Sequence, residues 1–116
     1  MSSRVNVPGQ DQLYTDGKGF RWRVDRLIGL AKELTPFQHP LSSLEELDCD
    51  VWERLPTIRE VSSHCKRIND ADMSFPIILS KEGHIMDGCH RLAKAFMRGD
   101  DTILAVQFTE DPDPDF

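Results

Sequence analysis

The stretch PIILSKEGHIMDGCHRLAKA, residues 76–95, decides the fold. Two short apolar runs, residues 76–79 and residues 85–86, lie on either side of a polar turn that contains Gly83. This pattern predicts two strands joined by a tight turn, in which glycine takes a positive φ. A helix is then predicted to follow Gly88 directly, because glycine allows a sharp bend and lets another group approach the backbone closely.

The predicted helix has two unlike faces at helical spacing. The basic face carries His90, Arg91, Lys94 and Arg98. The apolar face, which is expected to pack on the sheet, carries Leu92, Ala93, Ala95 and Phe96. The basic face begins at the helix N-terminus, where N–H groups and the helix dipole favour an anion such as phosphate. An ordinary amphipathic helix with a solvated basic face has the same pattern, so both interpretations stay open.

Asp87 also has two interpretations. As the N-cap of the helix, its carboxylate would accept a hydrogen bond from the backbone N–H of Cys89 or His90. As a functional residue, it would hold Mg²⁺ or act as a base beside a phosphate. A carboxylate can face an anionic phosphate only through a metal ion or a donor hydroxyl.

Residues 87–91, Asp-Gly-Cys-His-Arg, follow a predicted strand and precede an alanine-rich helix. They resemble the signature of the ParB/sulfiredoxin superfamily, in which sulfiredoxins carry Gly-Gly-Cys-His-Arg. Some ParB-like domains that phosphorylate small molecules carry Asp-Gly-His-His-Arg. The resemblance covers residues 20–108 and is sharp over 76–108, where the strands, the helix and Gly99 come in the family's order. It implies an α+β fold with a small mixed β-sheet flanked by helices.

The resemblance also implies a function, the binding of ATP or another nucleotide, or of another phosphate-bearing small molecule. The residues that would contact this ligand are Gly88, His90, Arg91 and Lys94. Asp87 would bind Mg²⁺ and act in catalysis. The reaction would be phosphoryl transfer from ATP to a small acceptor, or nucleotide hydrolysis.

Two other functions remain open. A sulfiredoxin-like reductase would use Cys89 as a catalytic nucleophile, because a helix N-terminus beside His90 and Arg91 lowers the pKa of a thiol. Asp87 stands where sulfiredoxins have their first glycine and would repel a thiolate, and Cys89 can equally be a small residue that fits the turn. The third possibility is a non-catalytic, nucleotide-responsive binding module, as in ParB partition proteins. Direct DNA binding is not expected, since no helix-turn-helix follows the last predicted strand.

The chain of 116 residues is the size of one domain. We expect a poorly ordered lead-in at 1–18, the domain at 19–109, and an extended, mobile acidic tail at 110–116. The net charge is −6, and the tail supplies −4 of it. The remaining −2 does not favour non-specific binding to nucleic acid.

Location and redox state follow from what the sequence lacks. No apolar run approaches the roughly 18 residues of a membrane span, and residues 1–6 lack the apolar core of a signal peptide. We therefore expect a cytoplasmic protein. Cys49, Cys65 and Cys89 form no Cys-x-x-Cys pair, so a zinc site is not expected. An odd number of cysteines in a chain without an export signal predicts free thiols.

The remaining elements are predicted from periodicity and turn residues. They are a strand at 20–23, a helix at 24–34, an edge segment at 35–41, a short helix at 42–47, a helix at 58–69 and a buried strand at 102–108. The helix at 58–69 is expected to pack through Ile58, Val61, Cys65 and Ile68. His64 borders this stripe and is expected to be a core histidine, and Trp52 is expected to be a packing anchor.

Overall fold

The computed structural model describes residues 12–52 and 57–116. The strands are β1 (Leu13–Thr15), β2 (Arg21–Arg23), β3 (Phe37–Pro40), β4 (Ile77–Leu79), β5 (Ile85–Asp87) and β6 (Thr102–Gln107). The helices are α1 (Val24–Ala31), α2 (Ile58–Asp70) and α3 (Cys89–Arg98), with two 3₁₀ turns, η1 (Leu41–Ser43) and η2 (Glu45–Asp48). No helix in the described residues has the length and apolar composition that crossing a membrane requires.

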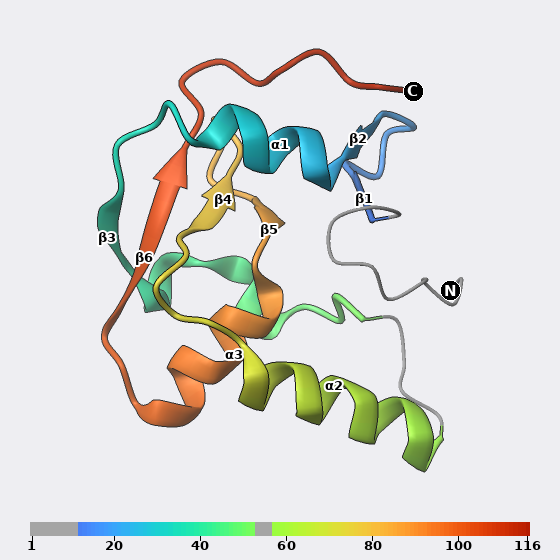
Figure 1. The fold of residues 1–116 in the computed structure, drawn as a ribbon, viewed down its shortest axis with the longest axis vertical. Helices are drawn as coiled ribbons and strands as arrows, with labels where there is room; N and C mark the ends of the chain where they lie inside the picture. Colours follow the sequence, from blue (N-terminus) through green and yellow to red (C-terminus); the bar gives the residue numbers. More distant parts are fainter. Residues whose placement is uncertain (1–11, 53–56) are drawn as a thin grey trace.

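The main sheet has four strands in the order β3-β6-β4-β5. β6 runs parallel to β4, whereas β3 is antiparallel to β6 and β5 is antiparallel to β4. β1 and β2 form a separate antiparallel hairpin. Figure 1 shows α1 on one side of the main sheet, with α2 and α3 toward the other end of the molecule. The predicted α+β fold with a small mixed sheet is confirmed.

The core lies on both faces of the sheet, because the two central strands are buried on both sides. The cluster on the α3 side contains Leu41, Leu44, Ile77, Leu79, Ile85, Leu92, Ala95, Ile103 and Ala105. The cluster on the α1 side contains Trp22, Leu27, Ala31, Ile78, Met86, Val106 and Phe108. Ile77 and Leu79 thus belong to one cluster and Ile78 to the other, as the alternation of side chains along a strand requires.

Gly88 joins β5 to α3 in a conformation that other residues rarely adopt. Its φ is +121°, and a Cβ built on it would lie 2.5 Å from Cγ2 of Ile77 and 3.1 Å from Cα of Ile77. The group that approaches this glycine closely is therefore β4. Gly88 is also the N-cap of α3 and makes no side-chain hydrogen bond there, so the prediction that Asp87 caps the helix is wrong.

α2 forms as predicted, but it does not pack as predicted. Oγ1 of Thr57 accepts a hydrogen bond from the N–H of Glu60 at 3.1 Å, which caps the helix. None of the described residues of α2 is buried, and Ile58 is 87% exposed. The expected apolar stripe therefore lies largely at the surface, with Val61 and Cys65 also exposed.

Three local features differ from the sequence predictions. Strand β1 lies inside the segment 1–18 that was expected to be poorly ordered, and it pairs with β2. Residues 1–11 of this segment lie outside the described residues. The short helix predicted at 42–47 is replaced by η1 and η2. α1 ends at Ala31 rather than at residue 34. Strand β6 and the helix C-cap at Gly99, with φ +78°, are as predicted.

Segment 109–116 is extended, as predicted, but it is held against the domain. Nε1 of Trp22 donates a hydrogen bond to the carbonyl of Pro112 at 2.8 Å. The N–H of Asp115 donates to the carbonyl of Arg21 at 2.8 Å. The mobility expected from its acidic, proline-rich composition is outweighed by contacts that only the folded domain supplies.

Glu46, on η2, contacts the outer edge of β5. Its Oε2 accepts a hydrogen bond from the N–H of Ile85 at 2.9 Å. Its Oε1 is buried, with no hydrogen-bond partner among the described residues. β5 is an edge strand with β4 as its one neighbour in the sheet, and the carboxylate of Glu46 thus satisfies a backbone N–H on its outer side.

Replacement of Gly88 by alanine tests the close packing of this corner. Gly88→Ala is expected to lower the free energy of unfolding by about 2–4 kcal/mol, because the new methyl group collides with Ile77 and the backbone is strained. Gly29→Ala in α1 is the matched control, since its Cβ would meet nothing within 4 Å. It is expected to stabilise the chain by about 0.5–1 kcal/mol. Urea unfolding measures both, and a loss below about 0.5 kcal/mol for Gly88→Ala contradicts the packing argument.

Candidate functional site

The corner between β5 and α3 holds an internal ion pair. Nη2 of Arg91 lies 2.9 Å from Oδ2 of Asp87, one helical turn earlier in the chain. Both side chains are largely buried, with 16% and 21% of their surface exposed. The cation that was predicted to bind phosphate and the carboxylate that was predicted to bind metal are therefore bonded to each other.

Two histidines meet between α2 and α3. Nδ1 of His64 lies 2.9 Å from Nε2 of His90, so one imidazole donates a hydrogen bond and the other accepts it. The ring of Trp52 stacks on His90 with a centroid distance of 4.9 Å and an interplanar angle of 18°. It lies at the same centroid distance from His64, at 40°. The three rings form a compact, half-buried group beside the first turn of α3.

Lys94 joins the same two helices, but it points away from the corner. Its Nζ donates hydrogen bonds to the carbonyls of Asn69 at 2.8 Å and Ala71 at 2.9 Å. These carbonyls lie at the C-terminal end of α2, where an ammonium group complements the helix dipole. The structure thus gives Lys94 a role in holding α2, and its predicted contact with a ligand would require these bonds to break.

Acidic groups lie near two of the cations of α3, Arg91 and Lys94. The pKa of Asp72 is lowered, first by hydrogen bonds from the side chain and backbone of Ser74, and further by the charges of Arg91 and Lys94. Asp72 therefore lies within electrostatic reach of both cations. The basic face predicted from the sequence is balanced by Asp72 and Asp87, so its local field is weaker than the pattern of side chains indicates.

Cys89 lies at the first position of α3, as predicted, but in different surroundings. Burial, together with the charges of Glu46 and Asp87, raises the pKa of its thiol to about 12, and Arg91 opposes this shift only in part. The prediction that its position lowers the pKa is wrong. Burial outweighs the helix N-terminus here, so the group stays a neutral thiol at physiological pH.

A small hollow lies beside this corner, between α3 and the chain around η2. Its volume is about 200 Å³. It is lined by Glu46, Leu47, Cys49, Val51, Trp52, Cys89, Leu92, Ala93, Phe96 and Met97. The lining is mainly apolar, and the side chains of Phe96 and Met97 are 64% and 69% exposed. An apolar group of a small ligand fits such a place.

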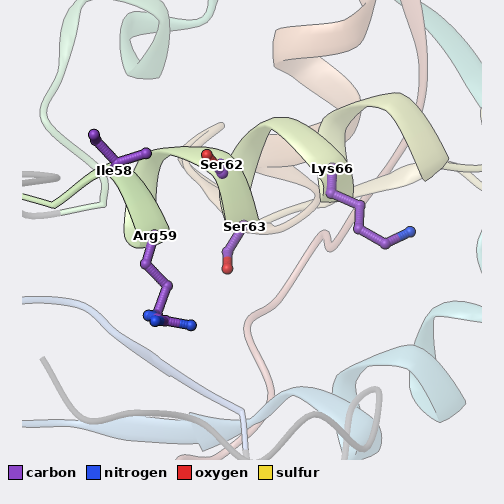
Figure 2. Close-up of a pocket in the computed structure, with 5 residues that line it drawn as sticks. All are labelled: Ile58, Arg59, Ser62, Ser63 and Lys66. Carbon is purple, nitrogen blue, oxygen red and sulfur yellow. The ribbon is translucent and has the colours of Figure 1, made fainter.

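A second hollow, of about 520 Å³, lies along the outer surface of α2. Figure 2 shows the residues that line it, all on this one helix, with Arg59, Ser63 and Lys66 directed to one side and Ile58 to another. These side chains do not converge on one point, and Nζ of Lys66 is paired with Asp70 at 2.7 Å. It is an open depression of the surface and not a formed site.

The described residues do not form a protein-held magnesium site. Across residues 12–52 and 57–116, no group of three or more histidine, cysteine, aspartate or glutamate side chains is placed to hold a metal ion. Asp87 offers a single carboxylate, and Arg91 already contacts it. Binding of Mg²⁺ through Asp87 stays a prediction, and no chemical step is derived from it.

The corner therefore gathers five of the six predicted residues, in the run from Asp87 to Arg91. His64 and Trp52 were not predicted to be site residues. His64 was expected in the core, and the signal for its role was only its place at the border of an apolar stripe that turns out to be exposed. No pattern in the sequence indicates which side chain of α3 a residue of α2 will meet.

The reactivity of Cys89 tests its surroundings. At pH 8, iodoacetamide is expected to modify the exposed Cys49 and Cys65 well before Cys89, because only thiolates react. Because the pKa of its thiol is about 12, Cys89 in the folded chain should react slowly throughout the physiological range, and its rate should still rise about tenfold for each unit of pH. Mass spectrometry of the digested protein measures each site, and the chain unfolded in urea is the control. Equal rates at the three cysteines of the folded chain would contradict the raised pKa.

Comparison of the chain with family models, with curated proteins and with solved structures finds no match. The resemblance to the ParB/sulfiredoxin superfamily therefore rests on residues 87–91 and their context in the sequence.

Proposed function

We propose that this chain is a ParB/sulfiredoxin-like, cytoplasmic domain that binds a phosphate-bearing small molecule of the nucleotide class at the first turn of α3. The observation that carries the proposal is the hydrogen-bonded pair of His64 and His90. This pair lies at the first turn of α3, whose N-cap residue, Gly88, makes no side-chain hydrogen bond to the helix. Helix N-termini attract anions, and an imidazole pair adds a hydrogen bond or a proton to a phosphate oxygen.

Arg91 takes part in this binding by exchanging its partner. In the free chain its guanidinium is bonded to the carboxylate of Asp87. A phosphate group offers more negative charge and more acceptor oxygens than a carboxylate, so it competes for the same guanidinium. When no ligand is bound, the carboxylate of Asp87 therefore takes the place of the phosphate beside Arg91. Its negative charge opposes the binding of an anionic ligand.

The hollow beside the corner accommodates the less polar part of the ligand. Trp52 lines this hollow and also stacks on His90, so it connects the apolar space with the imidazole pair. Phe96 also lines the hollow, is 64% exposed and presents a second aromatic surface. Aromatic side chains stack on nucleobases, which favours a nucleotide over inorganic phosphate alone.

The ion pair of Asp87 and Arg91 favours a binding module over a phosphotransferase. The carboxylate of Asp87 is engaged by the guanidinium of Arg91, so it is not available as a base or as a metal ligand while the pair is intact. Phosphoryl transfer is the second candidate, and it requires that the ligand's phosphate first releases Asp87. For the reductase alternative, the neutral thiol of Cys89 offers no support.

Thermal unfolding with added nucleotides tests the proposal. ATP, ADP, CTP and GTP are each added with and without Mg²⁺, and at about 100 times its Kd the bound nucleotide should stabilise the chain by about 2.7 kcal/mol. His90→Ala is expected to remove this gain. His39→Ala, on the edge strand β3, is the matched control and should keep it. If no nucleotide raises the melting temperature of the wild-type chain, the proposal is wrong.

Asp87→Asn separates the two candidates. Removing the carboxylate charge frees Arg91 for phosphate, so nucleotide affinity is expected to rise by about fivefold to tenfold, in line with the loss of one opposing charge near a partly buried site. Isothermal titration calorimetry measures this change. Release of phosphate from ATP is followed in parallel. Turnover that Asp87→Asn abolishes would identify a phosphotransferase or hydrolase, and weaker binding by this variant would contradict the exchange of partners.

A further inference from the structure

The end of segment 110–116 lies beside β2 and pairs with the backbone of Arg21. The N–H groups of Asp115 and Phe116 donate to the carbonyl of Arg21 at 2.8 and 3.2 Å, and the N–H of Arg21 donates to the carbonyl of Phe116 at 3.4 Å. The hairpin partner β1 occupies the other edge of β2. Figure 1 shows the end of the chain returning past α1 to this hairpin.

Side chains make this edge selective for an acidic segment. Oδ2 of Asp115 accepts hydrogen bonds from the backbone N–H of Arg23 at 2.8 Å and from Nη1 of Arg26 at 3.1 Å. Nη1 of Arg26 also donates to the carbonyl of Asp113 at 2.8 Å. One carboxylate is thus held by a backbone amide and a guanidinium together. The same contacts lower the pKa of Asp115, the hydrogen bond from Arg23 most of all.

The last aromatic side chain is recognised as well. The guanidinium of Arg21 lies 5.0 Å from the ring centroid of Phe116, and that of Arg23 lies 5.7 Å from it. Both distances are in the range of cation–π contacts. Recognition therefore combines the backbone hydrogen bonds of Arg21, one carboxylate and one aromatic ring.

The tail lies on the surface of the domain rather than in its core. Phe116 is 52% exposed, and the side chain of Arg26 is 37% exposed. Exposed ion pairs contribute little to stability and weaken as salt increases. One contact reaches the core, because Nε1 of the buried Trp22 donates to the carbonyl of Pro112 at 2.8 Å. A segment that replaces the tail must therefore supply the same carbonyl acceptor, while the other contacts of the tail lie at the surface.

We propose that the outer edge of β2, with Arg21, Arg23 and Arg26, is a binding site for an extended acidic segment of another protein, in which an aspartate precedes an aromatic residue. Residues 110–116 of the chain occupy the site as an intramolecular competitor. The carbonyl of Arg21 decides between a peptide and a nucleic acid, because it needs an N–H donor that a peptide backbone supplies and a phosphate backbone does not.

Residues 110–116 are covalently attached to the domain, so they bind its arginines more readily than a free peptide does, and an experiment must remove this difference. A segment attached by a short linker competes at an effective concentration in the millimolar range. A free peptide with the same contacts therefore binds weakly to the wild-type chain. Weakening the tail of the chain, without changing the arginines, should expose the site.

The experiment uses the full chain and a fluorescein-labelled peptide with the sequence of residues 110–116. Fluorescence anisotropy is expected to show that the chain with Asp115→Asn and Phe116→Ala binds the peptide about tenfold tighter than the wild-type chain. Adding Arg26→Gln to this variant should cost about tenfold. Arg98→Gln, in an ion pair with Asp100 at the far end of α3, is the matched control and should have no effect.

Circular dichroism establishes that each variant is folded, and Asp115→Asn alone serves as a milder change of the tail. The proposal is overturned if neither tail variant binds the peptide more tightly than the wild-type chain, or if Arg26→Gln leaves binding unchanged. Analytical ultracentrifugation covers the remaining case. A dimer of the wild-type chain that Arg26→Gln dissociates would assign the site to the tail of a second copy, and would also overturn the proposal.

Discussion

The approach of Gly88 to β4 determines how the rest of the corner is arranged. Because nothing larger than a hydrogen atom fits between this residue and Ile77, the chain must turn from β5 into α3 at one place and in one direction. That direction sets α3 on the sheet through Leu92 and Ala95, which are almost completely buried. It also places Asp87, one residue earlier, within reach of Arg91. The close approach that was predicted at Gly88 is made by Ile77 of the same domain.

The charges of the corner are largely compensated within the domain. Arg91 is bonded to Asp87, and Lys94 is bonded to the carbonyls that end α2. Under the proposed function, the features that recognise a ligand are more specific than a basic face. They are a helix N-terminus, the hydrogen-bonded imidazole pair, and the aromatic ring that stacks on that pair. This arrangement favours a binding mode in which one internal partner is exchanged for an external one.

The sequence predicted the elements better than it predicted their contacts. The turn between β4 and β5, the C-cap at Gly99 and the buried strand β6 follow from local rules about glycine and apolar alternation, so they were predicted correctly. The burial of α2 was predicted wrongly. An apolar stripe shows which face of a helix is suited to packing, but not whether another element lies opposite it. The pKa of Cys89 was wrong for a related reason, since the sequence indicates the neighbours along the helix but not the depth of burial or the approach of Glu46.

The contact of Glu46 with β5 bears on how the molecule behaves in a concentrated solution. An edge strand with open amides is a template on which a strand of another molecule can pair. Here a carboxylate oxygen already occupies the N–H of Ile85. Replacing Glu46 by a residue without a carboxylate would therefore promote association between folded molecules before it unfolds them. In this way the side chain of Glu46 protects the edge of the sheet against aggregation.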